Sequence, residues 1–420
     1  MTEPRQVQVD RRLARGLRLK AHKAMSTNAS IGPGPKPKEL VIGLKQHIGT
    51  AGEVLVAAGD RVRAGQKLAQ PGPPPSAAIH APLNGTISAI EDRPLPDGTG
   101  AAIVIAVDQQ DREASKASPP GYLDVSLLRD SGIVGLGGAV FPTGDKVTYA
   151  GHCPTLLING AECEPYISCD DMLMRERADS IARGSLSLLE LCDAAVCIIA
   201  IESDKPEAFR AISTALRQLD DERLSLAEVP TVYPAGGERQ LIQVLTGMEV
   251  PAGSYPPELG YLCHNVATAA AVDDLVRTGA PLTHRVVTVT GRGVAQPRNL
   301  WVAIGTPIAD LIAHCGGYTD GASRLIMGGN MMGLALPSDS IPITKATNCI
   351  VVATTEEVRG DTEERPCIRC GDCAFVCPAT LLPQELFRHT ANRNWEKLTE
   401  LHLDECIECG CCDIVCPSHI

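Results

Sequence analysis

The middle of the chain alternates short apolar runs with longer amphipathic stretches. The apolar runs have the length of buried strands: Thr155–Asn159, Ala194–Ile201 and Leu226–Tyr233. The amphipathic stretches have the length of helices: Asp171–Leu191, Lys205–Leu219 and Glu238–Thr246. Strands that alternate with helices predict a parallel sheet with crossover helices. Ligands of such a sheet bind at the carboxyl ends of its strands.

The segments that flank this region are patterned mainly as short strands. Residues 41–107 contain the phrases GDRVRAGQKLA and IHAPLNGTISAI, which resemble biotinyl and lipoyl carrier domains. Those carriers modify a lysine at a hairpin tip, whereas here the connection reads PGPPPSAA and holds no lysine. We therefore expect a barrel-sandwich scaffold without a carrier role. Further along, Val286–Thr290 and Cys349–Ala353 predict strands, and Thr306–Cys315 predicts a short helix.

Seventeen cysteines stand in a chain that lacks an apolar signal region, which favours metal ligation over disulfides. Residues 367–378 read CIRCGDCAFVCP and residues 406–417 read CIECGCCDIVCP. Both fit the Cys-x2-Cys-x2-Cys-x3-Cys-Pro pattern of bacterial two-cluster ferredoxins. Zinc ligands usually come as Cys-x2-Cys pairs with longer gaps, so two zinc sites fit this spacing less well.

Three closely spaced thiolates bind one cluster, and the fourth cysteine of each motif reaches the other cluster. The pattern therefore predicts two [4Fe–4S] clusters. The first is held by Cys367, Cys370, Cys373 and Cys416. The second is held by Cys406, Cys409, Cys412 and Cys377. Cys411 is an additional thiol in the second loop, and the stretch Leu381–Leu403 between the motifs predicts a helix. The sequence ends three residues after Pro417, an abrupt end that would fit a truncated chain.

Three polar clusters accompany the predicted sheet: GLGGAVFPTGDK (Gly135–Lys146), NGAECEPY (Asn159–Tyr166) and YPAGGER (Tyr233–Arg239). Consecutive glycines let backbone N–H groups approach a phosphate, and Lys146 adds a cation. Taken alone, the glycine loop is equally well explained as a plain turn, since it follows an expected helix, Leu123–Ser131. The other two clusters directly follow strands, and Asn159 offers both donors and acceptors to a heteroaromatic ring.

These phrases, with NVATA, IMGGNMMG and the paired cysteine motifs, resemble two known families. The middle of the chain is similar to the FMN- and NADH-binding domain of the respiratory complex I flavoprotein subunit. Nearly the whole chain resembles the C subunit of the Rnf electron transport complex. For residues 284–355 the resemblance implies a soluble-ligand-binding β-grasp domain. We interpret the IMGGNMMG turn, Ile326–Gly333, as a packing turn rather than as a flavin contact.

The resemblance implies an FMN site and an NADH site. The residues expected to hold FMN are Gly135, Gly137, Gly138, Lys146, Asn159, Glu162, Gly236, Asn265 and Thr268. Those expected at NADH are two stacking aromatics and two carboxylates: Phe141, Tyr149, Glu164 and Glu238. The sequence departs from the complex I pattern at Ala161 and Gly237, where acids are expected, and at Val140, which replaces a frequent glycine. The missing acids would weaken the binding of NADH and leave the FMN site unaffected.

The formal net charge of −12 argues against a nucleic-acid partner. Residues 1–50 carry ten Lys/Arg against three Asp/Glu, a balance of +7, and residues 356–420 carry six against thirteen, a balance of −7. The basic end either serves solubility or docks on a partner or an anionic membrane surface. The longest apolar runs are too short to cross a bilayer.

We therefore predict a multi-domain α/β protein with a basic N-terminal arm. The predicted parts are the arm (1–35), a barrel-sandwich hybrid (36–110), an FMN/NADH-binding α/β domain (111–280), a β-grasp domain (281–355) and a two-cluster ferredoxin-like domain (356–420). The resemblance implies a peripheral protein at the cytoplasmic side of the cell membrane. It would pass electrons between NAD(H), FMN and the clusters, with membrane subunits and a ferredoxin or flavodoxin as partners. Two alternatives are a soluble cobalamin-reducing flavoprotein and a non-enzymatic electron-relay adaptor.

Overall fold

The computed structural model describes residues 5–7, 9, 15–110, 118–358 and 363–420. A parallel five-stranded sheet forms the centre of the α/β domain. Its strand order is β1 (Arg5–Gln6), β12 (Leu224–Val229), β11 (Val196–Glu202), β10 (Thr155–Gly160) and β13 (Tyr261–Asn265). The three strands predicted here are therefore confirmed. The third ends at Val229 rather than at Tyr233, because the following Pro230 has no N–H group for the sheet.

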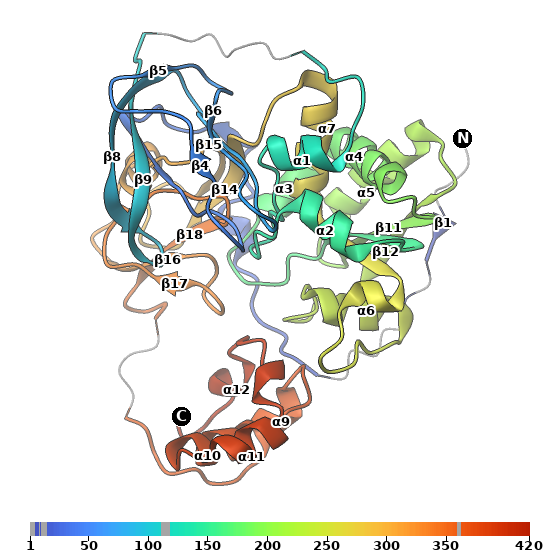
Figure 1. The fold of residues 1–420 in the computed structure, drawn as a ribbon. Helices are drawn as coiled ribbons and strands as arrows, with labels where there is room; N and C mark the ends of the chain where they lie inside the picture. The colour runs from blue at the N-terminus through green and yellow to red at the C-terminus, as the bar shows by residue number, and fades with distance from the viewer. Residues whose placement is uncertain (1–4, 8, 10–14, 111–117, 359–362) are drawn as a thin grey trace.

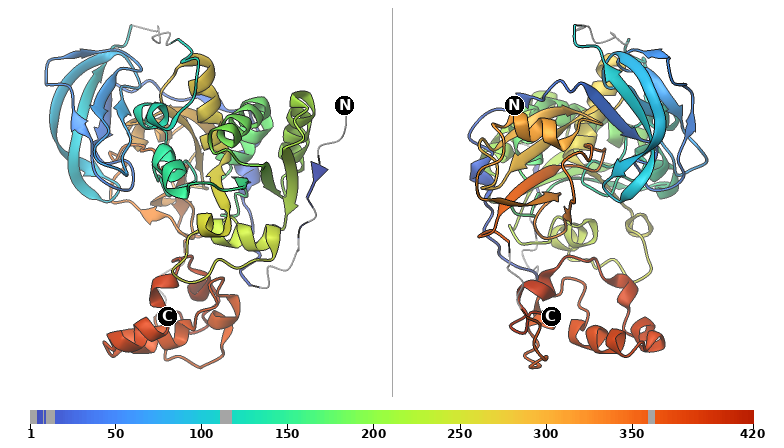
Figure 2. Two further views of the ribbon diagram at one scale, coloured as in Figure 1. Left: turned by 45° about the vertical axis from the view of Figure 1, so that its right-hand side comes forward. Right: turned by 90° about the vertical axis from the view of Figure 1, so that its left-hand side faces the viewer.

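Helices cover both faces of this sheet (Figures 1 and 2). They are α1 (Val125–Asp130), α2 (Thr143–Ala150), α3 (Cys169–Glu176), α4 (Ala178–Leu191), α5 (Pro206–Leu219), α6 (Glu238–Thr246) and α7 (Val266–Thr278). Leu156 and Ile158 of β10 lie in the core that includes α4 and α7, and Leu157 lies in the core that includes α6. The single helix predicted for 171–191 is wrong. The chain breaks at Arg177, whose guanidinium pairs with Asp274 of α7 at 2.5 Å.

The barrel-sandwich part consists of two small antiparallel sheets (Figure 1, blue). One holds β3 (Glu39–Gly43), β9 (Gly98–Val107), β8 (Gly85–Leu95) and β5 (Arg61–Val62), and the other holds β4 (Glu53–Val54), β6 (Lys67–Gln70) and β7 (Ile79–His80). The connection PGPPPSAA docks on the α/β domain: the Ser76 N–H donates to Asp145 Oδ2 at 2.7 Å, and Arg129 Nη2 donates to the Gly72 carbonyl at 3.0 Å. The segment in which carriers display their lysine is here an interdomain contact.

The β-grasp part is a six-stranded mixed sheet with one helix. Its order is β17 (Leu334–Ala335), β16 (Ala322–Met327), β18 (Cys349–Thr354), β14 (His284–Thr290), β15 (Arg298–Ala303) and β2 (Gly32–Pro33), and its helix is α8 (Ile308–His314). The edge strand β2 comes from the N-terminal segment. That segment also holds a short 3-10 helix, η1 (Lys23–Met25), and pairs Leu17 with Tyr233. The described part of the expected arm therefore packs on the chain's own domains.

A buried lysine joins three of the domains. Lys345 Nζ donates to the carbonyls of Ala78 in the barrel-sandwich part, at 2.9 Å, and of Gly132 in the α/β domain, at 2.7 Å. Burial lowers the pKa of Lys345 to about 7. A neutral amine retains both hydrogen bonds, so it can tie the domains together without a buried charge.

The C-terminal part lies below the α/β domain in Figure 1 (red). It contains α9 (Asp372–Val376), α10 (Pro383–Ala391), α11 (Trp395–Glu400), η3 (Leu403–Glu405) and α12 (Cys411–Ile414). The single helix predicted for Leu381–Leu403 is wrong, because Arg393 has a φ of 51° and Asn394 caps a new helix. Among the described residues, no helix combines the length and the apolar composition needed to cross a membrane.

Candidate electron-transfer sites

The glycine loop between α1 and α2 forms an open backbone cradle. Gly137, Gly138 and Ala139 are exposed, and a side chain added at Gly138 would meet no atom within 4 Å. Within the described part of the chain, the N–H groups of these three residues donate to no acceptor. Three neighbouring free N–H groups suit an anion such as a phosphate, so the loop fits the phosphate end of FMN.

The loop is fixed from behind by α7. The Leu136 N–H donates to Thr268 Oγ1 at 2.9 Å, and Thr268 is fully buried. Asn265 caps α7 by accepting from the Ala267 N–H at 2.8 Å, and a side chain at Gly137 would lie 3.4 Å from Asn265. The expected FMN residues of the loop and of α7 are therefore neighbours. Asn265 orients the helix start, and Thr268 orients the loop.

Asn159 and Gly236 meet at the carboxyl edge of the sheet, where Asn159 lies in β10 and Gly236 follows β12, with β11 between the two strands. Asn159 Nδ2 donates to the Gly236 carbonyl at 2.8 Å, and Asn159 Oδ1 accepts from the Ala161 N–H at 2.9 Å. A side chain at Gly236 would collide with the Ala161 carbonyl, 2.5 Å away. Only glycine permits this approach of the two loops, so the YPAGGER and NGAECEPY clusters form one surface.

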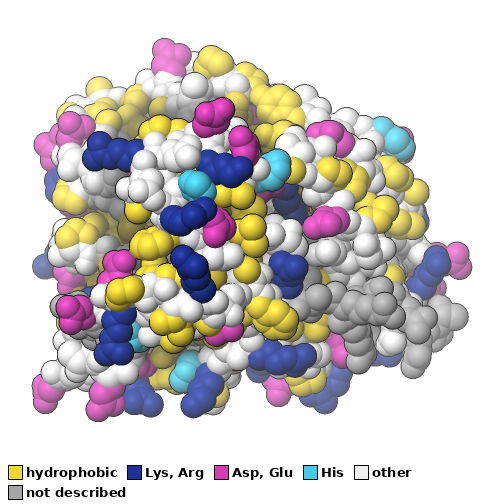
Figure 3. Space-filling view, turned by 90° about the horizontal axis from the view of Figure 1, so that it is seen from below, with side chains coloured by type: hydrophobic (Ala, Val, Ile, Leu, Met, Phe, Trp, Pro, Cys, Tyr) yellow, Lys and Arg dark blue, Asp and Glu magenta, His cyan; other side chains and the backbone are white. Residues whose placement is uncertain are grey.

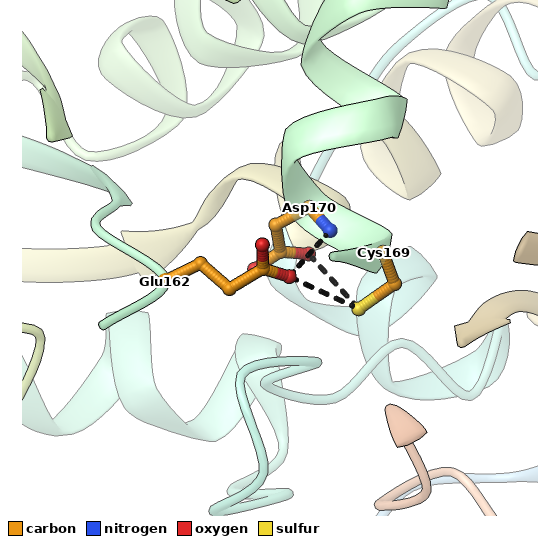
Figure 4. Close-up of side chains that lie close together, drawn as sticks. All are labelled: Glu162, Cys169 and Asp170. Atoms are coloured by element: carbon orange, nitrogen blue, oxygen red, sulfur yellow. Dashed lines mark hydrogen bonds between the residues drawn. The ribbon is translucent and has the colours of Figure 1, made fainter. Parts of the chain in front are cut away.

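Glu162 points into the interior beside Cys169 and Asp170 (Figure 4). Its Oε1 accepts from the Asp170 N–H at 2.9 Å and lies 3.5 Å from Cys169 Sγ. Lys23 Nζ lies 3.4 Å from Glu162 Oε2 and also donates to the Glu162 carbonyl. Burial and the Glu162 charge raise the pKa of Asp170 to about 7. Lys23 compensates the charge of Glu162, so the N-terminal segment stabilises this buried trio.

Lys146 and Glu238, expected at different ligands, form an ion pair. Lys146 Nζ lies 3.0 Å from Glu238 Oε1 and donates to the Cys263 carbonyl at 2.6 Å. Both side chains are partly exposed, so either can turn toward a ligand. Burial, with the nearby Lys146 charge, lowers the pKa of His264 to about 3, which keeps that neighbouring imidazole neutral.

The four residues expected at NADH fall into separate environments. The rings of Phe141 and Tyr149 meet edge to face with centroids 6.1 Å apart, and Tyr149 is exposed. Glu164 instead faces the IMGGNMMG turn, where its Oε1 accepts from the N–H groups of Met331 at 2.8 Å and Met332 at 2.9 Å. Burial raises the pKa of Glu164. The turn therefore packs on the NGAECEPY loop and engages one of the carboxylates expected at the nucleotide.

The two cysteine motifs repeat one backbone conformation. Left-handed residues recur at equal offsets from each first cysteine: Arg369 and Glu408 (φ 57° and 53°), Gly371 and Gly410 (86° and 72°), Thr380 and His419 (57° and 57°). Each Gly then begins a short helix, α9 or α12. Non-glycine residues with positive φ are uncommon, so their repetition marks two copies of the same loop.

The ends of the two motifs cross over. The Arg365 N–H donates to the Ser418 carbonyl at 2.8 Å, and Ser418 Oγ donates to the Pro366 carbonyl at 3.0 Å. These bonds bring the end of the second motif to the start of the first. Val376, which precedes Cys377, lies in one apolar cluster with Cys409 and Cys411, so the end of the first motif packs against the second loop.

A buried contact joins the second motif to the α/β domain. The Tyr233 hydroxyl donates to the Cys409 carbonyl at 2.7 Å, and Cys163 packs on the same apolar cluster. Arg239 Nη1 pairs with Glu405 Oε2 at 2.6 Å. Sequence reasoning gave Tyr233 and Cys163 no role, although both lie in the clusters YPAGGER and NGAECEPY. Their position directly after predicted strands was the one sequence feature that could have indicated a functional role. The buried Lys23, which contacts Glu162 of the NGAECEPY loop, could not be predicted, because nothing in the sequence around it indicates burial.

Domain families match successive parts of the chain. They are described as the RnfC barrel sandwich hybrid domain (residues 11–110), the Nuo51 FMN-binding domain (128–274), the SLBB domain (286–335) and the 4Fe-4S dicluster domain (363–420). The predicted multi-domain α/β fold class is thereby confirmed. The chain carries an FMN-binding domain and an iron–sulfur dicluster domain.

Similar proteins carry one name. The C subunit of the ion-translocating oxidoreductase complex of Pseudomonas aeruginosa is 44% identical over 382 residues, covering 88% of this chain and 49% of that protein. The protein of the same name from Vibrio cholerae is 44% identical over 389 residues, covering 90% and 49%. A solved NAD⁺-reducing [NiFe]-hydrogenase in the air-oxidized state covers 57% of this chain and 48% of its own at 22% identity, with a TM-score of 0.49. The chain spans about half the length of the curated relatives it matches, and over nearly nine tenths of its own length it is similar to C subunits of ion-translocating oxidoreductase complexes.

Proposed function

We propose that this chain is the peripheral electron-input subunit of a membrane-bound, ion-translocating oxidoreductase. In this role it passes electrons between NAD(H), FMN and two [4Fe–4S] clusters. The names of its relatives support the complex, and its FMN-binding and dicluster domains support the cofactors. The complex would exchange electrons with ferredoxin or flavodoxin through its membrane subunits, at the cytoplasmic side of the membrane.

The observation that carries the proposal is the contact between Tyr233 and Cys409. Tyr233 lies in the loop that also contains Gly236, one of the residues proposed to hold FMN, and Cys409 lies in a cluster motif. Bound flavin would supply the conversion between electron pairs and single electrons, and the protein positions it and tunes its potential. A flavin surface and a cluster loop that share a buried contact are what such a conversion requires.

We propose specific roles for the residues of this surface. Gly137, Gly138 and Lys146 would bind the phosphate of FMN, and Gly135, whose N–H donates to the Phe141 carbonyl at 2.9 Å, would hold the shape of the loop around it. The remainder of the flavin pocket would be Asn159, Glu162, Gly236, Asn265 and Thr268, with Glu162 and Thr268 acting from behind as supports. Phe141, Tyr149 and Glu238 would contact NADH. The contacts of Glu164 with the Met331 and Met332 amides support a role in holding the loop.

We also propose the cluster ligands assigned from the motif spacing. Cys367, Cys370, Cys373 and Cys416 would hold one cluster, and Cys406, Cys409, Cys412 and Cys377 the other. The bonds between Arg365, Pro366 and Ser418 support the crossing of Cys416, and the packing of Val376 against Cys409 and Cys411 supports the reverse crossing of Cys377.

An anaerobic titration of the reconstituted protein with NADH tests the proposal. Flavin absorbance should bleach, and EPR signals of reduced clusters should follow. A non-enzymatic relay adaptor is the second candidate, because Glu164 and Glu238 are both engaged within the protein. Protein that binds FMN and two clusters but whose flavin does not bleach with NADH would favour that adaptor. Rapid cobalamin reduction by the isolated chain would instead favour the soluble reductase.

A further inference from the structure

We propose that electrons from the flavin reach the cluster of Cys406, Cys409, Cys412 and Cys377 first, and leave from the cluster of Cys367, Cys370, Cys373 and Cys416. Tyr233 acts as the positioning residue of the first transfer. The inference rests on the proposed function. It adds the order in which electrons pass through the two clusters, which the similar sequences of the two motifs do not indicate.

The loop of the second motif is exposed at its first cysteine, Cys406, but its middle is buried against the α/β domain. The Cys409 side chain is only 8% exposed and Cys411 only 1% exposed. Both lie in one apolar cluster with Tyr233 and Val376, against which Cys163 and Met331 pack. The Tyr233 hydroxyl donates to the Cys409 carbonyl at 2.7 Å, which ties this loop to the α/β domain.

A continuous series of contacts leads from the flavin surface to this loop. The Gly236 carbonyl accepts from Asn159, and the Gly236 N–H donates to Cys163 Sγ at 3.4 Å. Cys163 in turn packs on the cluster that contains Tyr233 and Cys409. Electron tunnelling slows steeply with distance, and packed or hydrogen-bonded atoms carry it better than open solvent. The second motif is therefore the one joined to the flavin surface by packed and hydrogen-bonded contacts.

The loop of the first motif is exposed instead. Cys367 and Cys370 are exposed, and the flanking Ile368 and Phe375 are 68% and 75% exposed. The α9 helix contacts the N-terminal segment near its far end, where the Gly16 N–H donates to the Val376 carbonyl at 3.0 Å. Val376 precedes Cys377, the residue of this motif that we assign to the other cluster. On the face seen in Figure 3, hydrophobic side chains lie among charged ones.

Each step moves one electron. A dihydronicotinamide would supply the pair as hydride to bound flavin and leave as NAD⁺. The flavin would lose the pair as two single electrons to the second-motif cluster and release one proton to solvent, and that cluster would be reoxidised as the first-motif cluster is reduced. The first-motif cluster would reduce a one-electron acceptor outside this chain, a protein that carries an iron–sulfur cluster or a flavin. No proton or atom crosses between the clusters.

Matched cluster-deficient variants of the full chain test the order. Cys370→Ala and Cys409→Ala should each retain about four iron atoms. In C370A the remaining cluster should be reduced by NADH at the parent rate, as seen by freeze-quench EPR. In C409A dithionite should reduce the remaining cluster, but NADH should do so at least about a hundredfold more slowly. Equal NADH rates in the two variants, or loss of rapid reduction in C370A only, would overturn the order.

Two further measurements keep the inference testable if C409A fails to fold. Tyr233→Phe should slow the reduction of the clusters by reduced flavin several-fold, while the flavin itself is reduced at the parent rate. Tyr122→Phe, at an exposed position, is the control, and equal effects of the two changes would overturn the role of Tyr233.

The second measurement is the alkylation of cysteines in cluster-free protein. Cys367 and Cys370 should be alkylated at least about tenfold faster than Cys409. Equal alkylation rates would remove the basis of the order.

Photoreduction separates this inference from the proposed function. If NADH leaves the flavin oxidised, deazaflavin with light reduces the flavin without nucleotide. The same contrast between C370A and C409A after photoreduction would support the order although NADH is not the donor. No contrast after photoreduction would overturn the order whatever NADH does.

Discussion

The Tyr233 hydroxyl and the Cys409 carbonyl lie 2.7 Å apart in a buried contact between the α/β domain and the dicluster domain. Tyr233 is itself held by Leu17 through two backbone hydrogen bonds, of 2.8 and 2.9 Å. Three segments far apart in the sequence therefore converge where a flavin domain meets a cluster loop. This convergence gives the first prediction.

Tyr233→Phe should loosen the dicluster domain without unfolding the chain. The ring would still fill its place, but the Cys409 carbonyl would lose its donor, at a cost of about 1 kcal/mol. Hydrogen exchange should speed up in residues 406–412, by roughly fivefold for that energy. Tyr122→Phe, at an exposed position, serves as the control. Unchanged exchange in residues 406–412 would show that other contacts, such as Arg239 with Glu405, hold the interface alone.

Replacing Cys373 by Ala should remove one cluster and spare the flavin. Cys373 belongs to the first motif, away from the residues proposed to hold FMN, so flavin absorbance should be largely unchanged. Iron should fall from about eight to about four atoms per chain. Cys192→Ala, which changes a buried thiol in the α/β core, is the control for cysteine loss as such. Iron near eight atoms per chain in the Cys373 variant would show that our ligand assignment is wrong.

Lys146→Ala should weaken FMN retention, because it removes the cation that we propose to bind the FMN phosphate together with the glycine loop. We expect a loss of about tenfold in affinity, measured by equilibrium dialysis of the flavin. Lys146 also pairs with Glu238, so Glu238→Gln is the informative comparison. If E238Q weakens FMN as much as K146A, the lysine acts by holding the glutamate. If neither changes affinity, the loop has another role.

Lys345→Met should change how stability depends on pH. The unfolded lysine loses its proton near pH 10.5 and the folded one near pH 7, so between these values the unfolded state binds more protons. Stability of the parent should therefore rise from pH 7 to pH 9 relative to K345M, by a few kcal/mol. Urea unfolding at both values measures the difference. His47 and His80, also with lowered pKa values beside Lys345, titrate below this window. Identical pH profiles for parent and K345M would mean that Lys345 stays charged when folded.

The sequence by itself determined the features that depend only on neighbouring residues along the chain, namely most helices and strands and the cysteine motifs. Apolar periodicity gave the strands β10 and β11 and the helices α5 and α6, because backbone pairing and side-chain burial repeat every two or 3.6 residues. The motif spacing of the eight cysteines predicted the clusters, since a short loop limits which thiolates can share one cube. The helices predicted for 171–191 and 381–403 each proved to be two, because Arg177 and Asn394 make bonds that no periodicity shows.

Only the tertiary structure decided how distant segments meet. It paired Lys146 with Glu238 and turned Glu164 toward the amides of Met331 and Met332. It also buried two lysines between distant segments: Lys23 contacts Glu162, and Lys345 donates hydrogen bonds to Ala78 and Gly132. It also distinguished the two cluster loops, whose sequences are nearly the same, by burying one against Tyr233. These outcomes depend on contacts between residues far apart in the chain. Such contacts follow from the packing of whole domains, so they cannot be predicted from the hydrophobic pattern or the motifs of one segment.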